Sequence, residues 1–114
     1  MDAAERRKHP RITTYLPVRL KLQSSGRYVE TLAKDVSLGG VRCIVTGTPE
    51  VTELLVLEVP LYKEVLPIQA TAKVVWVQPI AETNQALIGI QFEGLTPEDA
   101  GVLAAYLEER LAQV

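Results

Sequence analysis

Apolar and polar residues alternate in short segments along most of the chain, and this pattern constrains the fold more than any other feature. In the first segment the apolar positions are Leu16, Val18, Leu20 and Leu22. Successive side chains of a strand point to opposite faces, so residues 13–22 are expected to form a strand with one buried face. Pro17 has no N–H for a ladder hydrogen bond, which indicates an edge or a bulge at that point.

Five further strands are expected, and turn residues rather than helices separate them. They cover residues 28–36, 41–45 and 54–59, a long strand ending at Pro79 with Ile68, Ala70, Ala72, Val74 and Trp76 on its inward side, and a last strand with Ile88, Ile90 and Phe92 inward. Cys43 and Trp76 are both expected in the core. Strands this close in sequence pair antiparallel, so the residues predict a mainly β fold that is either a barrel or a sandwich.

One helix is expected at the end of the chain, over residues 97–112. Thr96 supplies a capping hydroxyl, Pro97 suits the first helical position, and Asp99 is an acid three residues after the cap. An apolar stripe follows at helical spacing, formed by Val102, Leu103, Tyr106, Leu107 and Leu111. We expect this stripe to dock on the β domain.

The chain has room for one domain, since it has 114 residues. Residues 1–12 are polar and basic and are interpreted as a flexible arm, and residues 13–114 as the folded domain with its helix. The single cysteine, Cys43, and the absence of an apolar leader or of an apolar run of bilayer length indicate a cytoplasmic protein without membrane insertion.

Composition argues against two classes of function. Acid–base or metal catalysis needs clustered His, Cys or carboxylates, but the chain has one His, one Cys and dispersed acids, so no enzyme, no metal and no cofactor is predicted. A net charge of −2 and the lack of an aromatic series argue against a nucleic acid polymer as partner. Charge is nevertheless polarised, because residues 1–42 carry nine Lys/Arg against four Asp/Glu. Such a chain can present a local anion site.

Two motifs are candidates for that site. The first is a basic cluster that includes Arg6, Arg7 and Arg11, and the second is an acid–serine–glycine loop with Asp35, Ser37, Gly39 and Gly40. The first two strands form a hairpin that turns near Ser25, which pairs residues whose numbers add to roughly 50. Arg11 then lies at the same end of the hairpin as Gly39, so the two motifs converge.

The residue types suit a ligand with both a base and a phosphate. Arginine can bind phosphate, or the O6 and N7 acceptors of guanine, through two hydrogen bonds. The Asp35 carboxylate only accepts hydrogen bonds and suits the N1–H and N2–H₂ donors of guanine. Ser37 offers a hydroxyl, while Gly39 and Gly40 let the backbone approach a phosphate closely. The residues thus indicate an anionic guanine nucleotide.

These motifs resemble those of the PilZ domain family. The basic cluster matches the R-x-x-x-R motif of that family at Arg7 and Arg11, and the loop matches its D-x-S-x-x-G motif at Asp35, Ser37 and Gly40. The order of the later strands and the terminal helix is also similar. The resemblance implies a six-stranded antiparallel β-barrel with a C-terminal α-helix. It also implies a bacterial receptor for the second messenger cyclic di-GMP.

By this resemblance, Arg7 and Arg11 hold guanine and phosphate groups and Asp35 reads a guanine edge. Arg6 precedes the first motif arginine and is similar to the version that binds two stacked ligand molecules per chain. The receptor is expected to be a monomer or weak dimer and to relay the signal to an unidentified downstream protein, in motility or biofilm regulation. The alternative is a protein-interaction scaffold of the same fold that binds no nucleotide.

Overall fold

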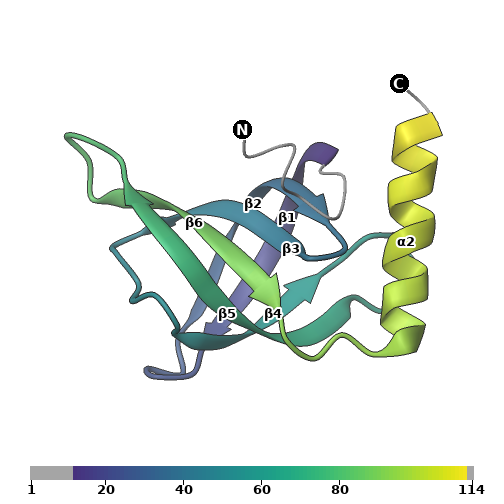
Figure 1. Cartoon of the computed structure of the whole chain (residues 1–114), viewed down its shortest axis with the longest axis horizontal. Coiled ribbons are helices and arrows are strands. Elements are labelled where there is room, and N and C mark those ends of the chain that lie inside the picture. The colour runs from purple at the N-terminus through teal and green to yellow at the C-terminus, as the bar shows by residue number, and fades with distance from the viewer. Residues whose placement is uncertain (1–11, 113–114) are drawn as a thin grey trace, which may run out of the picture.

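Within residues 12–112, six antiparallel strands close into a barrel and one helix follows (Figure 1). A computed structural model describes residues 12–112 of the chain, and residues 1–11 and 113–114 are not described. The elements are β1 (Ile12–Leu22), β2 (Tyr28–Ser37), β3 (Gly40–Thr46), β4 (Leu54–Val59), β5 (Ile68–Pro79), β6 (Gln85–Phe92) and α2 (Pro97–Ala112). Around the barrel the order is β1-β2-β3-β6-β5-β4, and β4 pairs again with β1. The residues alone left a barrel or a sandwich open, and the barrel is the fold observed.

The β1–β2 hairpin has the register that its turn predicts. Its pairs run from Leu16 with Ala33 to Lys21 with Tyr28, within one or two residues of the expected positions. A bulge follows between Thr13 and Leu16, beside Pro17, and Ile12 then pairs with Val36. The bulge expected near Pro17 is therefore present, and β1 begins at the end of the barrel where β2 ends.

Aliphatic side chains from all six strands fill the barrel. The most deeply buried of them are Leu20, Val36, Val41, Leu57, Val59, Val74 and Ile88. Cys43 is also fully buried, and this burial raises the pKa of its thiol to about 12 because the thiolate would lose its hydration. The expectation that Cys43 belongs to the core is confirmed.

Trp76 does not continue the inward row of β5, which corrects the expectation that it is a core residue. The row is buried up to Val74, but a bulge between Val74 and Trp76 shifts the register, so that Val77 rather than Trp76 lies opposite Ile88. A Cβ placed on Gly89 would lie 2.3 Å from the indole Nε1 of Trp76. Since Ile88 and Ile90 point inward, Gly89 faces outward. The half-buried indole therefore covers Gly89 on the outer face of the barrel.

Helix α2 begins as its sequence predicts and extends the barrel core. The Asp99 N–H donates to Thr96 Oγ1 over 3.1 Å, which is the expected N-cap. Leu103, Tyr106 and Leu107 are buried in the same cluster as the barrel side chains, whereas Leu111 is exposed. The docking stripe therefore ends one turn earlier than expected.

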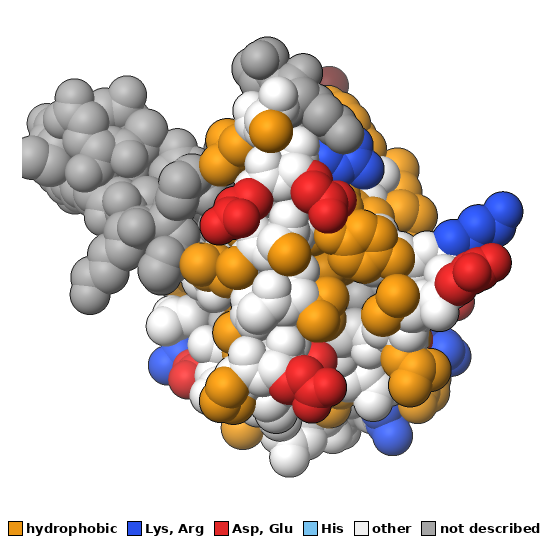
Figure 2. Space-filling model, turned by 90° about the vertical axis from the view of Figure 1, so that its right-hand side faces the viewer, with side chains coloured by type: hydrophobic (Ala, Val, Ile, Leu, Met, Phe, Trp, Pro, Cys, Tyr) orange, Lys and Arg blue, Asp and Glu red, His pale blue; other side chains and the backbone are white. Residues whose placement is uncertain are grey.

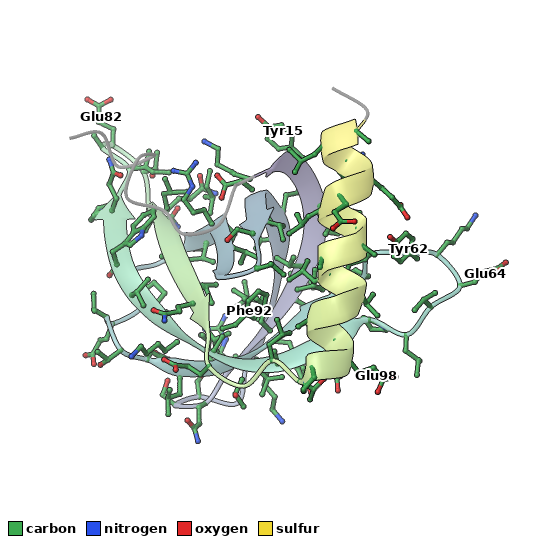
Figure 3. The ribbon with its side chains drawn as sticks, turned by 45° about the vertical axis from the view of Figure 1, so that its right-hand side comes forward. Tyr15, Tyr62, Glu64, Glu82, Phe92 and Glu98 are labelled. Atoms are coloured by element: carbon green, nitrogen blue, oxygen red, sulfur yellow. The ribbon has the colours of Figure 1, made fainter. Side chains whose placement is uncertain are left out.

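The connection between β4 and β5 runs beside the helix. Tyr62 lies beside helix α2 (Figure 3). Its ring packs edge to face on Tyr106, with 5.9 Å between the ring centroids, and its hydroxyl donates to Glu109 Oε2 over 3.2 Å. Figure 2 looks onto this side of the molecule, where apolar side chains lie next to acidic ones. No helix in the described part of the chain is long and apolar enough to span a bilayer.

Candidate functional site

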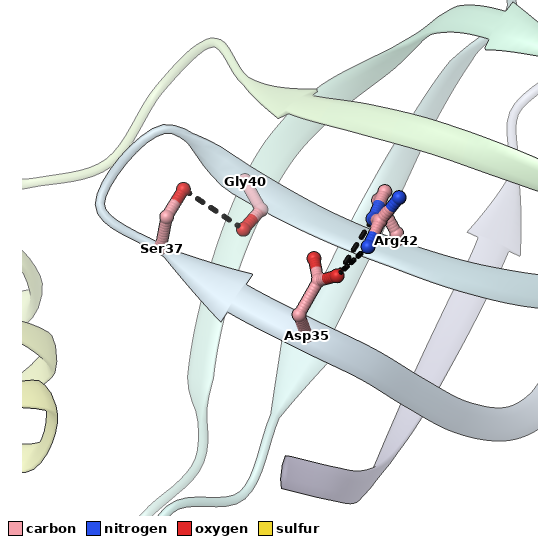
Figure 4. Close-up of polar contacts among 4 residues, drawn as sticks. All are labelled: Asp35, Ser37, Gly40 and Arg42. Carbon is pink, nitrogen blue, oxygen red and sulfur yellow. Dashed lines mark hydrogen bonds and ion pairs between the residues drawn. The ribbon is translucent and has the colours of Figure 1, made fainter. Parts of the chain in front are cut away.

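The second sequence motif forms the turn between β2 and β3. Ser37 pairs with Gly40, so that Leu38 and Gly39 make a two-residue turn. The Gly39 N–H donates to Ser37 Oγ over 3.1 Å, and Ser37 Oγ lies 3.5 Å from the carbonyl oxygen of Gly40 (Figure 4). Ser37 is buried and thus organises its own turn. The N–H of Gly39 is therefore bonded within the loop.

Gly40 is required where β2 and β3 meet β6. A Cβ at this position would lie 1.8 Å from the carbonyl oxygen of Ile90, which no side chain can tolerate. The carbonyl of Gly39 also accepts the Phe92 N–H over 2.9 Å. The turn is therefore pressed against β6 and held in one place, which gives a physical reason for the glycine of the motif.

Asp35 is paired with Arg42, an arginine that lies outside both sequence motifs. Asp35 and Arg42 lie opposite each other in the β2–β3 register, and Arg42 Nε donates to Asp35 Oδ2 over 2.6 Å (Figure 4). Arg42 Nη2 contacts the same oxygen. The hydrogen bond raises the pKa of the Arg42 guanidinium above its ordinary value. Asp35 is only 3% exposed, so this is a buried carboxylate held by a cation that reaches solvent.

The Asp35–Arg42 pair belongs to a row on the outer face of the barrel. Arg42 lies opposite Gly89 of β6, and Gly89 lies opposite Trp76 of β5. The neighbouring residues Val36, Val41, Ile90 and Val74 point into the core. We call Asp35, Arg42, Gly89 and Trp76 the outer row. A carboxylate, a guanidinium and an indole thus share one face, with a glycine between the last two.

The start of β1 lies beside this row. Thr13 pairs with Asp35 and Ile12 with Val36, so the chain enters the barrel beside the acid of the second motif. Arg6, Arg7 and Arg11 lie outside the described residues. Arg11 directly precedes Ile12 in the sequence. The predicted convergence is therefore observed as far as Ile12, and the positions of the three arginines stay a prediction.

The outer row and the adjacent turn bring four kinds of polar or planar group together. These are a fixed carboxylate, a guanidinium, a buried hydroxyl and an indole. Within residues 12–112 there is no group of three His, Cys, Asp or Glu side chains that could hold a metal ion. The carboxylate can accept hydrogen bonds from a base, the guanidinium can attract a phosphate, and the indole can contact a planar ring.

A family model and solved structures match this fold. The model of the PilZ domain matches residues 5–109. The inhibitor of motility MotI/DgrA of Bacillus subtilis superposes with a TM-score of 0.80 at 20% identity, over 95% of this chain and 52% of that one. The PilZ domain of YcgR from Escherichia coli, solved with c-di-GMP, gives a TM-score of 0.72 at 14% identity, over 95% of this chain and 93% of that domain. Among curated protein sequences, none matches.

The MrkH–c-di-GMP complex of K. pneumonia gives a TM-score of 0.72 at 22% identity, over 95% of this chain and 53% of MrkH. This chain therefore spans about half the length of MotI/DgrA and MrkH. At these identities the solved structures show the fold, and the family model covers nearly the whole sequence. The resemblance to the PilZ domain family is confirmed, and the chain belongs to that family.

Proposed function

We propose that this chain is a receptor for cyclic di-GMP that binds the dinucleotide on the outer row, with the basic arm closing the site. One observation carries the proposal most directly: Thr13 pairs with Asp35, so the arm that carries the first motif enters the barrel beside the second. Consecutive Cα atoms are about 3.8 Å apart, which keeps Arg11 within reach of this end of β2. The YcgR PilZ domain and MrkH, which have the same fold, were solved with c-di-GMP.

The two motifs bind different parts of the ligand. Arg7 and Arg11 neutralise phosphate and contact the O6 and N7 acceptors of guanine. Asp35 accepts hydrogen bonds from the N1–H and N2–H₂ edge, while Ser37, Gly39 and Gly40 let the ligand lie close to the backbone. This is a binding role in the cytoplasm rather than a catalytic one. Arg6 precedes the first motif arginine and, by the resemblance to the family, is similar to the version that binds two stacked ligand molecules, so we propose two per chain.

The signal is proposed to pass to a partner protein through the arm. Closure of residues 1–11 over the ligand would change the surface at the start of β1, and an unidentified downstream protein would read that change. Limited proteolysis with and without cyclic di-GMP tests this step. Cleavage near residues 6–11 should slow when the ligand is added, and an unchanged rate would contradict closure of the arm.

Calorimetric titration with cyclic di-GMP tests the receptor function itself. The wild-type chain should bind with a stoichiometry of two, and Arg7→Ala, Arg11→Ala and Asp35→Ala should each weaken binding by tenfold or more, about the size of one charge-assisted hydrogen bond. Lys63→Ala is a matched control, because it removes one cation from the β4–β5 connection, away from the motifs. A wild-type chain that does not bind would leave a protein-interaction scaffold. A stoichiometry of one would reject only the stacked pair.

A further inference from the structure

The Asp35–Arg42 pair raises the question of what Arg42 contributes. Asp35 is 3% exposed, yet its carboxylate is held by a side chain that is itself 37% exposed. Both Nε and Nη2 of Arg42 contact the same oxygen, Oδ2. A guanidinium presents these two groups in one plane, so the contact restricts rotation of the carboxylate.

Gly89 and Trp76 form the outer face beside Arg42. Gly89 lies opposite Arg42 and has no side chain, and the space that its Cβ would enter is filled by the Trp76 indole. Any larger residue at position 89 would have to displace Trp76, since even a Cβ would lie 2.3 Å from Nε1. The glycine and the indole therefore shape the outer face next to Arg42. Arg42 itself is anchored on β3, a strand paired on both sides.

We propose that Arg42 is a positioning residue, which orients the Asp35 carboxylate for guanine recognition and offsets its charge. This inference rests on the proposed binding of cyclic di-GMP. A carboxylate can accept N1–H and N2–H₂ together only when its plane matches the base edge. An uncompensated carboxylate would also repel the ligand phosphates. Arg42 both orients the Asp35 carboxylate and offsets its charge, and it does so from β3, which is paired on both sides, whereas the motif arginines belong to the arm.

The inference makes a prediction about ligand choice that a purely structural role does not. Cyclic di-IMP carries the same phosphates, O6 and N7 as cyclic di-GMP but lacks the N2 amino group. A well-oriented Asp35 should therefore favour cyclic di-GMP. If Arg42 provides that orientation, its substitution should reduce the preference for cyclic di-GMP over cyclic di-IMP. Substitution of an arginine that binds only phosphate would weaken the binding of both ligands equally.

The experiment measures dissociation constants of both ligands for the full chain and its variants, with circular dichroism to check folding. Wild type should prefer cyclic di-GMP by about tenfold, the value of one hydrogen bond to a charged group. Arg42→Ala should weaken cyclic di-GMP binding about tenfold and reduce the preference to about twofold or less, and Asp35→Ala should do the same. Arg42→Lys keeps the charge without the planar fork, so it should lose part of the preference while retaining the fold.

Two comparisons make the test decisive. Lys73→Ala is the matched control, because Lys73 is equally exposed and forms an ion pair with Glu93 over 3.1 Å, and it should leave the preference unchanged. Adding Arg42→Ala to Asp35→Ala should change binding less than about twofold, since Arg42 acts through Asp35. Equal weakening of both ligands by Arg42→Ala and Arg42→Lys, or full additivity with Asp35→Ala, would overturn the inference. A wild type that binds neither ligand would instead refute the proposed function and the inference with it.

Discussion

The two faces of the wall formed by β2, β3, β6 and β5 carry opposite chemistry at the same level of the barrel. The inner face carries the apolar side chains of Val36, Val41, Ile90 and Val74. The outer face, at the residues next to them, carries the outer row of Asp35, Arg42, Gly89 and Trp76. One set is aliphatic and dry, while the other combines a buried ion pair with a glycine and an indole.

This difference separates stability from recognition within single strands. Aliphatic residues in the inner row close the barrel, and the hydrophobic effect rewards their burial. A buried carboxylate is a costly way to gain the same stability, because it loses its hydration, while its Arg42 partner stays partly exposed. The Asp35–Arg42 pair on the outer face fits the binding role that we propose for the outer row. The comparison can be tested by changing one face at a time.

The largest effect on stability is expected from the inner face. Ile90→Ala removes a side chain that is 3% exposed and should lower the free energy of unfolding by about 3 kcal/mol, because it leaves a cavity in a packed core. Urea unfolding measures this change. Binding of cyclic di-GMP to the folded variant should stay close to wild type. A folded variant with normal stability and no binding would break the division between the two faces.

A smaller and unequal effect is expected from the ion pair. Arg42→Ala removes the hydrogen bonds that a 3% exposed carboxylate receives from β3, and should cost about 2 kcal/mol of stability. Asp35→Asn should cost less than about 1 kcal/mol, because water can hydrate the more exposed guanidinium. Thermal unfolding of the two variants under one condition measures the difference. The opposite order would mean that Arg42, not Asp35, is the buried partner.

The pH dependence of stability tests whether water is excluded from Cys43 in the core of the barrel. Burial raises its thiol pKa to about 12 from an ordinary 9.0, so both folded and unfolded chains keep the proton below pH 9. Between pH 9 and 12 the unfolded chain releases the proton while the folded chain retains it, so stability falls as the pH rises. Relative to Cys43→Ala, wild type should lose about 1 kcal/mol between pH 9 and pH 10. An identical pH dependence of the two proteins would show that water reaches Cys43.

Local sequence signals predicted the elements because each is bounded by residues with a short-range effect. The expected strand 54–59 and helix 97–112 coincide with β4 and α2, since Pro60 ends one and the Thr96 cap begins the other. Trp76 was misplaced for the opposite reason. The alternation of apolar residues continues through Trp76 in the sequence, but a bulge turns Trp76 outward, where its indole lies over Gly89 of another strand.

The site was predictable in part. Folding about the Ser25 turn brought the two motifs to one end of the barrel, and the observed β1–β2 pairs agree. The same reasoning about the Leu38–Gly39 turn places Arg42 opposite Asp35, so this pair could have been found from the sequence. Arg42 was overlooked because it lies in an otherwise apolar strand. The internal bond from Gly39 to Ser37 needed side-chain geometry.

The central claim, that the outer face of this wall binds cyclic di-GMP, is tested most directly by NMR titration of the ¹⁵N-labelled chain. The account predicts that the ligand shifts the backbone amides of Ser37, Gly40, Arg42 and Gly89 and the indole N–H of Trp76. The amides of β1 and β4 where they pair, such as those of Arg19 and Glu58, should change little. Shifts confined to the β1–β4 side, or none at saturating ligand, would contradict it.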